Sequence, residues 1–105
     1  MSTNPLLSGL APTHPGEVLR EDILPAMDRS KTEIARLLGI SRQTLHDVLA
    51  ERQPVTPAMA LRLAKLFGTS PQMWVNLQRD YDLGILAASM RDELAAIPTL
   101  PRDAA

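Results

Sequence analysis

Gly39 separates two short amphipathic segments, and this spacing limits the possible folds more than any other feature of the sequence. Ser30 precedes the first segment and Glu33 follows three residues later, a capping-box pattern in which the two side chains can satisfy free amides at the start of a helix. Glycine readily adopts the left-handed conformation that ends a helix. The pattern therefore predicts a helix over 31–38 that stops at Gly39.

The second segment follows Ser41, whose hydroxyl can cap a helix over 42–51. Two helices joined by a turn of three or four residues that contains glycine form a helix-turn-helix unit. Ala35 is small enough to allow the close helix crossing of such a unit. An ordinary helical hairpin would explain the apolar positions equally well, but not the polar outward face of the second helix. The apolar residues expected to hold the unit together are Ile34, Leu38, Ile40, Leu45 and Val48.

Hydroxyl residues followed by proline mark the starts of two further helices. Thr56-Pro57 and Ser70-Pro71 each combine a hydroxyl cap with a proline at the first helical position, where the missing N–H costs nothing. These pairs predict one helix over 57–67, which glycine at 68 stops, and another that begins at residue 71.

A chain rich in leucine and alanine, with three aromatic residues among 105, favours an all-α domain. We expect a helix-turn-helix domain over 14–83 and a C-terminal helical extension over 84–97. A flexible N-terminal arm over 1–13 and a disordered tail over 98–105 should flank them. Pro25 should end the first helix near Ile23, and Gly84 should weaken the helix that enters the extension.

The net charge of −1 hides an uneven distribution. Between Arg29 and Lys65 seven basic residues face three acidic ones, whereas the rest of the chain holds four basic and nine acidic residues. A basic middle with acidic flanks is typical of a surface that faces DNA. A mixed solvated surface could produce the same imbalance.

The sequence contains no residue pattern typical of a catalytic site or of a metal or cofactor site. It has no cysteine, and its two histidines lie in no cluster of possible ligands. His14 beside Pro15-Gly16 is interpreted as a capping or packing residue. No apolar run is long enough to cross a bilayer, and the N-terminus lacks the layout of a signal peptide. We therefore expect a cytoplasmic protein that has no membrane partner and is not an enzyme.

The helix predicted over 42–51 concentrates polar residues at its start, where a recognition helix approaches base edges in the major groove. Arg42 could donate two hydrogen bonds to guanine, and Gln43 could pair with adenine. Each of these residues, taken singly, could instead be an ordinary solvated side chain. The candidates for base reading are Arg42, Gln43, Thr44, His46 and Asp47. The candidates for phosphate contacts are Lys31, Thr32, Ser41 and Arg52.

Trp74, Leu77 and Tyr81 recur at helical spacing and should form one stripe. The stripe could pack into the core against neighbouring helices, or it could contribute to a homodimer contact. A dimer would suit DNA binding, because a single unit of this size reads few base pairs.

Five linked segments of the chain resemble the HigA antitoxin family, a branch of the xenobiotic-response-element helix-turn-helix proteins related to phage repressors. The resemblance covers roughly residues 14–83. The opening His-Pro-Gly-Glu motif and the Thr-Pro and Ser-Pro-x-x-Trp helix starts are specific to this branch. The segments are 14–19 (HPGEVL), 32–39 (TEIARLLG), 40–45 (ISRQTL), 54–64 (PVTPAMALRLA) and 70–78 (SPQMWVNLQ).

The resemblance implies a five-helix, lambda-repressor-like core, a homodimer and repression through a palindromic operator in the protein's own promoter. It also implies a complex with a HigB-type toxin, an mRNA-cleaving ribonuclease of the RelE-like superfamily that the antitoxin inhibits. Arg42, Gln43 and Thr44 match the recognition-helix positions of the family. Residues that contact the toxin do not carry over by motif, and the segment after 83 lies outside the shared pattern.

Two other functions remain open at this point. The chain could be a stand-alone transcriptional regulator without a toxin partner, or an interaction module whose helix-turn-helix no longer binds DNA. The operator sequence, the toxin surface, the geometry of the dimer and any effector are not determined by the sequence.

Overall fold

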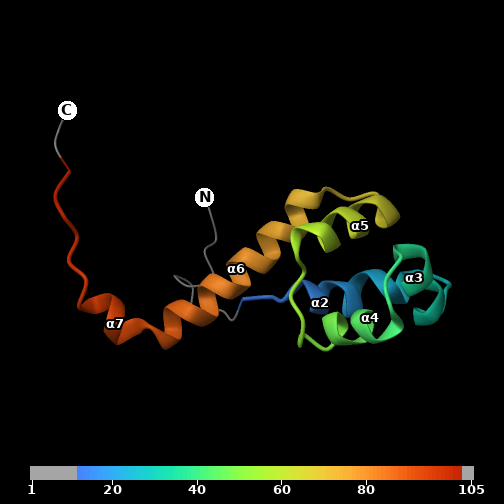
Figure 1. Ribbon diagram of the computed structural model, residues 1–105, viewed down its shortest axis with the longest axis horizontal. Coiled ribbons are helices and arrows are strands. Elements are labelled where there is room, and N and C mark those ends of the chain that lie inside the picture. The colour runs from blue at the N-terminus through green and yellow to red at the C-terminus, as the bar shows by residue number, and fades with distance from the viewer. Residues whose placement is uncertain (1–11, 103–105) are drawn as a thin grey trace.

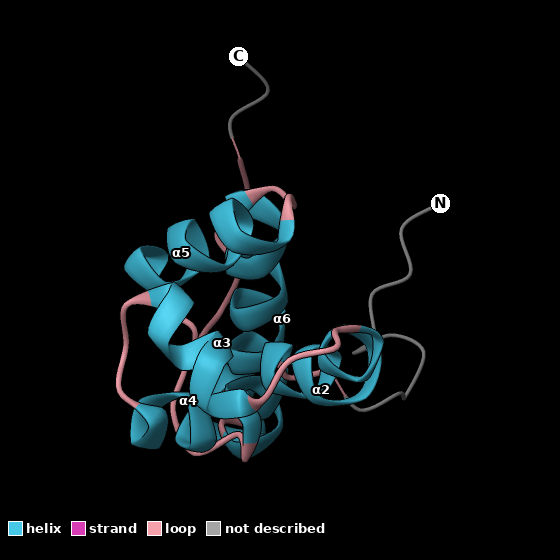
Figure 2. Ribbon diagram, turned by 90° about the vertical axis from the view of Figure 1, so that its right-hand side faces the viewer, coloured by secondary structure: helices cyan, strands magenta, loops and turns pink. Residues whose placement is uncertain are grey.

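The computed structural model describes residues 12–102, and these form an array of helices without a strand (Figures 1 and 2). The all-α prediction is therefore confirmed. Of the predicted arm over 1–13 the structure describes only residues 12 and 13, and of the predicted tail over 98–105 it describes residues 98–102; none of these is helical. The helices are α2 (Pro15–Val18), α3 (Lys31–Leu38), α4 (Arg42–Leu49), α5 (Pro57–Phe67), α6 (Pro71–Ser89) and α7 (Arg91–Ala95).

The first helical segment continues beyond α2 as a π-helical turn, Leu19–Ile23, and a 3₁₀ turn, Leu24–Ala26. Pro25 lies in the 3₁₀ turn, so the α-helical hydrogen-bond pattern ends ahead of the proline, as expected. The chain leaves this turn in extended conformation at Met27.

Four hydroxyl residues cap the following helices at their N-termini. The side chains of Ser30, Ser41, Thr56 and Ser70 each accept a hydrogen bond from the amide three residues later, at 3.1, 2.9, 3.2 and 3.1 Å. Prolines follow Thr56 and Ser70 at the first helical position, as predicted. The capping pattern therefore sets where α3, α4, α5 and α6 begin.

One predicted helix end is wrong, and one helix break falls where none was predicted. The helix expected over 42–51 ends at Leu49, because Glu51 adopts a positive φ of 63° and turns the chain. Gly84 does not interrupt α6, which runs to Ser89, since one glycine costs a helix only about 1 kcal/mol. The break instead falls at Met90, between α6 and α7. The predicted domain boundary at 83/84 thus lies inside a continuous helix.

The core forms where α2 to α6 meet, and Trp74 of α6 is completely buried in it. Ala35 is 2% exposed, which agrees with the expected close crossing of α3 and α4. Ile40, in the turn between these helices, is half-buried against the core. The buried apolar residues are Leu19, Ile34, Ala35, Leu38, Leu45, Val48, Leu49, Val55, Met59, Ala60, Leu63, Ala64 and Trp74.

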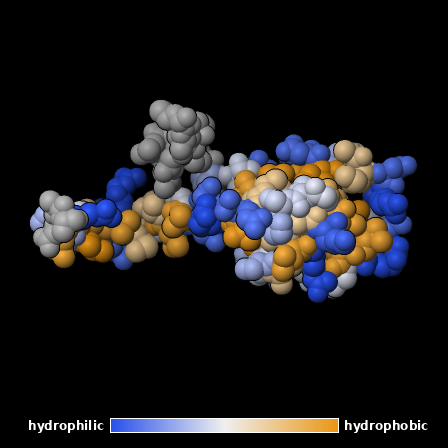
Figure 3. Space-filling view, turned by 90° about the horizontal axis from the view of Figure 1, so that it is seen from above, coloured by the Kyte–Doolittle hydropathy of each residue, from blue (hydrophilic) through white to orange (hydrophobic). Residues whose placement is uncertain are grey.

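The C-terminal half of α6 leaves this body and, together with α7, extends to one side (Figure 1). Apolar side chains on this extension face solvent, and they appear as orange patches along its length in Figure 3. The exposed apolar residues of this region are Leu83, Ile85, Leu86, Leu94, Ile97 and Leu100.

Candidate nucleic-acid interface

Helix α4 presents a polar face to solvent, as the sequence predicts for a recognition helix. Arg42, Gln43 and His46 are exposed and line a shallow hollow on the surface. Ser41 is exposed just before them, and Thr44 is half-buried. The apolar side of the same helix lies in the core, so α4 can be approached by a large ligand only along this polar face.

The side chains of Ser41 and Thr44 are hydrogen-bonded at the start of α4. Ser41 Oγ accepts the Thr44 amide and donates to Thr44 Oγ1 at 2.8 Å. These bonds fix the first turn of α4. Each hydroxyl oxygen retains acceptor capacity, and that of Thr44 still has its own proton to donate.

Asp47 joins two other candidate residues. Its Oδ1 accepts a hydrogen bond from Gln43 Nε2 at 3.0 Å and an ion-paired bond from Arg52 Nη2 at 2.9 Å. The bond from Arg52 lowers the pKa of Asp47 below its ordinary value, with a further contribution from Gln43. Arg52 itself is mostly exposed, so donors remain free on its guanidinium.

Lys31 and Thr32 lie exposed in the first turn of α3. Lys31 also borders a hollow beside the 3₁₀ turn, together with Arg20 and Arg29. The predicted capping box is only half formed here. Ser30 accepts the Glu33 amide, but the Glu33 carboxylate pairs with Arg29 at 3.0 Å and Arg36 at 3.7 Å instead of returning to the Ser30 amide.

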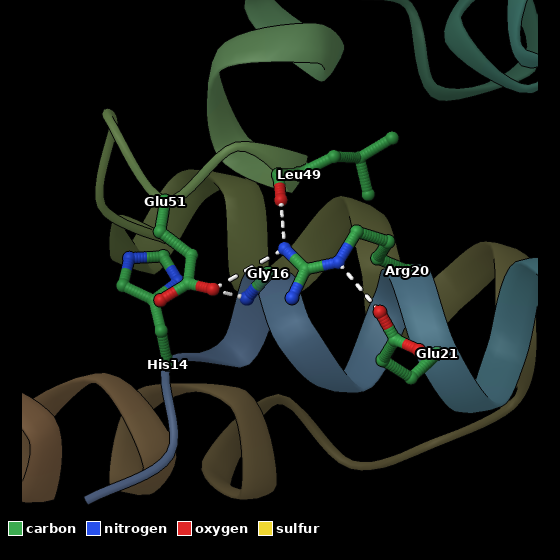
Figure 4. Close-up of polar contacts among 6 residues, drawn as sticks. All are labelled: His14, Gly16, Arg20, Glu21, Leu49 and Glu51. Carbon is green, nitrogen blue, oxygen red and sulfur yellow. Dashed lines mark hydrogen bonds and ion pairs between the residues drawn. The ribbon is translucent and has the colours of Figure 1, made fainter.

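Arginines from outside the helix-turn-helix unit hold the C-terminal ends of both its helices. Arg62 of α5 donates to the Leu38 carbonyl of α3 at 2.8 Å, next to Gly39 with its φ of 74°. Arg20 donates to the Leu49 carbonyl of α4 at 2.6 Å and pairs with Glu51 at 3.2 Å (Figure 4). Each cation sits where the helix dipole is negative, so both contacts favour the observed helix ends.

His14 is buried and connects α2 to the other helices. Its Nδ1 accepts the Gly16 amide at 2.8 Å, which caps α2, and its ring meets that of Tyr81 edge-on at 4.8 Å between centroids. Desolvation lowers the pKa of His14 below its ordinary 6.5 and outweighs the opposing influence of Glu51 and Asp82. The interpretation of His14 as a capping and packing residue is therefore confirmed.

We predict that the domain loses stability as the pH falls below about 6.5, because His14 must stay neutral to accept the Gly16 amide. Below that value the unfolded chain binds a proton that the folded chain binds less readily, so acid favours unfolding. The loss should be complete below the lowered folded-state pKa. Urea unfolding between pH 5 and pH 8 measures it.

An asparagine in place of His14 can cap the helix without titrating. The variant His14→Asn should therefore show a flatter stability profile over the same pH range. The two proteins differ only at position 14 and share the exposed His46, so a difference between their stability profiles reports on His14 alone. An equally steep profile in the variant would contradict the assignment.

The residues of the predicted stripe have different surroundings. Trp74 is fully buried, and its Nε1 donates to Thr69 Oγ1 at 2.7 Å. Leu77 is half-buried against the core, and Tyr81 packs on His14. The exposed apolar residues of α6 begin after this stripe, at Leu83.

Gln78 is a buried polar residue that the sequence reasoning missed. Its side chain accepts the Val55 amide at 2.7 Å and donates to Asp82 at 2.9 Å. It thereby fastens the loop after α4 to helix α6. Its position one turn after Trp74 on the same helix was the available signal.

No group of three or more possible His, Cys, Asp or Glu metal ligands occurs between residues 12 and 102. Over the same stretch, no helix has the length and apolar character needed to cross a membrane.

The family model for helix-turn-helix proteins matches residues 19–74. The Virulence-associated protein I of Dichelobacter nodosus is 40% identical over 70 residues, which are 67% of this chain and 65% of that protein. The uncharacterized HTH-type transcriptional regulator YbaQ of Escherichia coli K12 is 36% identical over 91 residues, or 85% of this chain and 80% of that protein.

Among solved structures, the Pseudomonas aeruginosa antitoxin HigA with the higBA promoter superposes with a TM-score of 0.81 at 37% identity. The match covers 86% of this chain and 99% of that one. The helix arrangement thus matches nearly the whole length of that antitoxin chain. The chain belongs to the helix-turn-helix family and, within it, to the branch that contains the HigA antitoxins.

Proposed function

We propose that the protein is an antitoxin that represses its own promoter as a dimer and neutralises a HigB-type toxin. The observation that carries the DNA-binding part is the face of α4, on which Arg42, Gln43 and His46 lie exposed on a helix whose other side is held in the core. The HigA of Pseudomonas aeruginosa, which has the same fold, is solved with promoter DNA. Both observations support insertion of α4 into the major groove.

In this complex, bases are contacted from the start of α4 and phosphates from its surroundings. Arg42 would donate to guanine and Gln43 to adenine, with Thr44 and His46 beside them. The phosphate contacts would come from the first turn of α3, from the cap of α4 and from the loop after it. The proposed phosphate ligands are Lys31, Thr32, Ser41 and Arg52.

We predict that Arg42→Ala weakens binding to the promoter by about 1–3 kcal/mol and relaxes preference at one base pair. Fluorescence anisotropy with a duplex from the protein's own promoter measures the affinity, and a panel of single-base changes measures the preference. Arg36→Ala is the matched control, because Arg36 is an exposed arginine of α3 that lies outside both the proposed DNA contacts and the proposed dimer groove. Equal losses for the two variants would contradict a base-reading role.

The dimer would form through the extension of the chain. Leu83 and Leu86 are both about half exposed and border a mostly apolar groove between α6 and the loop that precedes α5. Apolar surface of this kind on a small protein favours association. A second copy related by a two-fold axis could cover it and bring a second α4 to a half-site about 34 Å away.

We predict that Leu83→Glu converts the dimer to a monomer, since a carboxylate would be buried without a partner. Sedimentation velocity measures the assembly, and circular dichroism checks that the helices remain. Ser89→Glu, an exposed position later on the same helix, is the control. A variant Leu83→Glu that stays dimeric would place the interface elsewhere.

Toxin neutralisation rests on membership of the HigA branch. A neighbouring reading frame for a small basic chain, and co-purification of that chain with this one, would support it. Suppression of the toxin's mRNA cleavage by the purified protein is the direct test. The alternative is a stand-alone regulator, which the similarity to YbaQ favours. Promoter binding without any toxin partner would select that alternative.

A further inference from the structure

Asp47 and Gln43 lie one turn apart on α4, and their side chains are joined. Asp47 Oδ1 receives both Gln43 Nε2 at 3.0 Å and Arg52 Nη2 at 2.9 Å. An ionised carboxylate can only accept hydrogen bonds. Gln43 must therefore turn its amide nitrogen, and not its carbonyl oxygen, toward Asp47.

This orientation leaves a defined edge of Gln43 free. The amide has two N–H groups, and one of them is used by Asp47. The carbonyl oxygen and the second N–H remain, and they match the N6 donor and N7 acceptor of adenine in the major groove. Guanine offers two acceptors at the corresponding positions, so the carbonyl of Gln43 would find no donor there.

Asp47 itself is poorly placed to read a base. Its side chain is 27% exposed, and the oxygen that faces Gln43 already accepts from Arg52 as well. The ion pair with Arg52 keeps the pKa of Asp47 low, so the carboxylate stays charged near neutral pH. Arg52 also offsets a negative charge that would otherwise repel the phosphates.

We propose that Asp47 is a positioning residue that fixes the amide of Gln43 for adenine, with Arg52 holding the carboxylate in place. The proposal rests on the DNA-binding function proposed above and replaces direct base reading by Asp47. It makes base discrimination at one position depend on a residue that contacts no base.

The test is a selection of binding sites from a random duplex library, followed by sequencing. The wild type, Asp47→Asn, Gln43→Ala and the double variant are compared, each after its helix content has been verified by circular dichroism. Asparagine can donate as well as accept, so the Gln43 amide can turn around in Asp47→Asn. The preference for adenine at one base pair should fall about tenfold in both single variants, and the double variant should fall no further.

Glu33→Gln is the matched control for charge, because it removes a carboxylate from the same helix-turn-helix unit without touching Gln43. Both Asp47→Asn and Glu33→Gln should tighten binding to sequences that lack the preferred adenine, because both reduce repulsion of the phosphates. Only Asp47→Asn should change the preferred base.

A second measurement needs no DNA. The side-chain amide resonances of Gln43 should shift in NMR spectra when Asp47 is protonated by acid, and the shift should vanish in Asp47→Asn. Gln43 amide resonances that do not change when Asp47 is protonated would overturn the proposed pairing of Gln43 with Asp47.

Three selection results would contradict the proposal in different ways. An unchanged site for Asp47→Asn would overturn the positioning role while leaving the proposed function intact. A further change of preference in the Gln43→Ala background would show that Asp47 reads a base itself. A wild-type chain that selects no sequence would overturn the proposed DNA-binding function as well.

Discussion

Replacement of Trp74 by alanine should lower the free energy of unfolding by about 3–5 kcal/mol. The indole is completely buried, so its removal leaves a cavity among residues from several helices as well as the loss of transfer free energy. The variant also leaves the Thr69 hydroxyl without the Nε1 donor. A loss of this size is a large part of the roughly 5–15 kcal/mol that stabilises a typical domain.

Urea unfolding followed by far-ultraviolet circular dichroism measures this loss, because Trp74 is the only tryptophan and its fluorescence disappears with it. Trp74→Phe is the control, since it keeps an aromatic ring but removes the bond to Thr69. It should cost less than the alanine variant. Equal costs for the two variants would mean that the hydrogen bond, and not the packed ring, dominates.

Gly16→Ala should destabilise the domain by about 3 kcal/mol, although alanine is normally the better helix former. A Cβ at position 16 would collide with the carbonyl oxygen of Val48, so α2 and α4 would have to move apart. That oxygen belongs to the backbone and cannot rotate away as a side chain could. The close approach explains why glycine follows the cap and the proline in the opening motif.

Gly68→Ala provides the comparison for Gly16→Ala. Gly68 has a φ of 69°, and a Cβ there would meet nothing within 4 Å. Its cost should therefore reflect backbone strain alone, about 1 kcal/mol. Urea unfolding of both variants separates collision from strain. A Gly16→Ala variant no less stable than Gly68→Ala would show that α2 and α4 can separate at little cost.

Local chemistry allowed the helix starts to be predicted from sequence. Ser41, Thr56 and Ser70 accept hydrogen bonds from amides three residues later, so the caps can be recognised from a few neighbouring residues. The same holds for the glycine ends of α3 and α5, which were placed correctly. The end of α4 before Glu51 and the break at Met90 were not predicted, because these helix ends carry no such local signal.

The supports of the candidate interface could not be predicted in the same way. Arg20 reaches a carbonyl 29 residues away, Arg62 one 24 residues away, and Gln78 an amide 23 residues away. Nothing in the surrounding sequence distinguishes the two arginines from solvated ones, and the position of Gln78 one turn after Trp74 suggests burial but not its partner. The polar face of α4 could be predicted because helical periodicity alone separates it from the core. Gln43 and Asp47 have the spacing of neighbours on one helix face, so their hydrogen bond could be predicted. The bond from Arg52 to the same carboxylate oxygen depends on the turn at Glu51 and could not.

The two arginines at the helix ends have a consequence for protein engineering. Arg62 and Arg20 belong to helical segments outside residues 30–52. The helix-turn-helix unit therefore depends on the rest of the domain for its geometry. A recognition helix transplanted from a relative should keep the orientation of α4 only under two conditions. The carbonyl of residue 49 must still reach Arg20, and position 51 must still carry an acid. Reprogramming the DNA target of this scaffold should therefore leave 49–51 untouched and confine changes to the first two turns of α4.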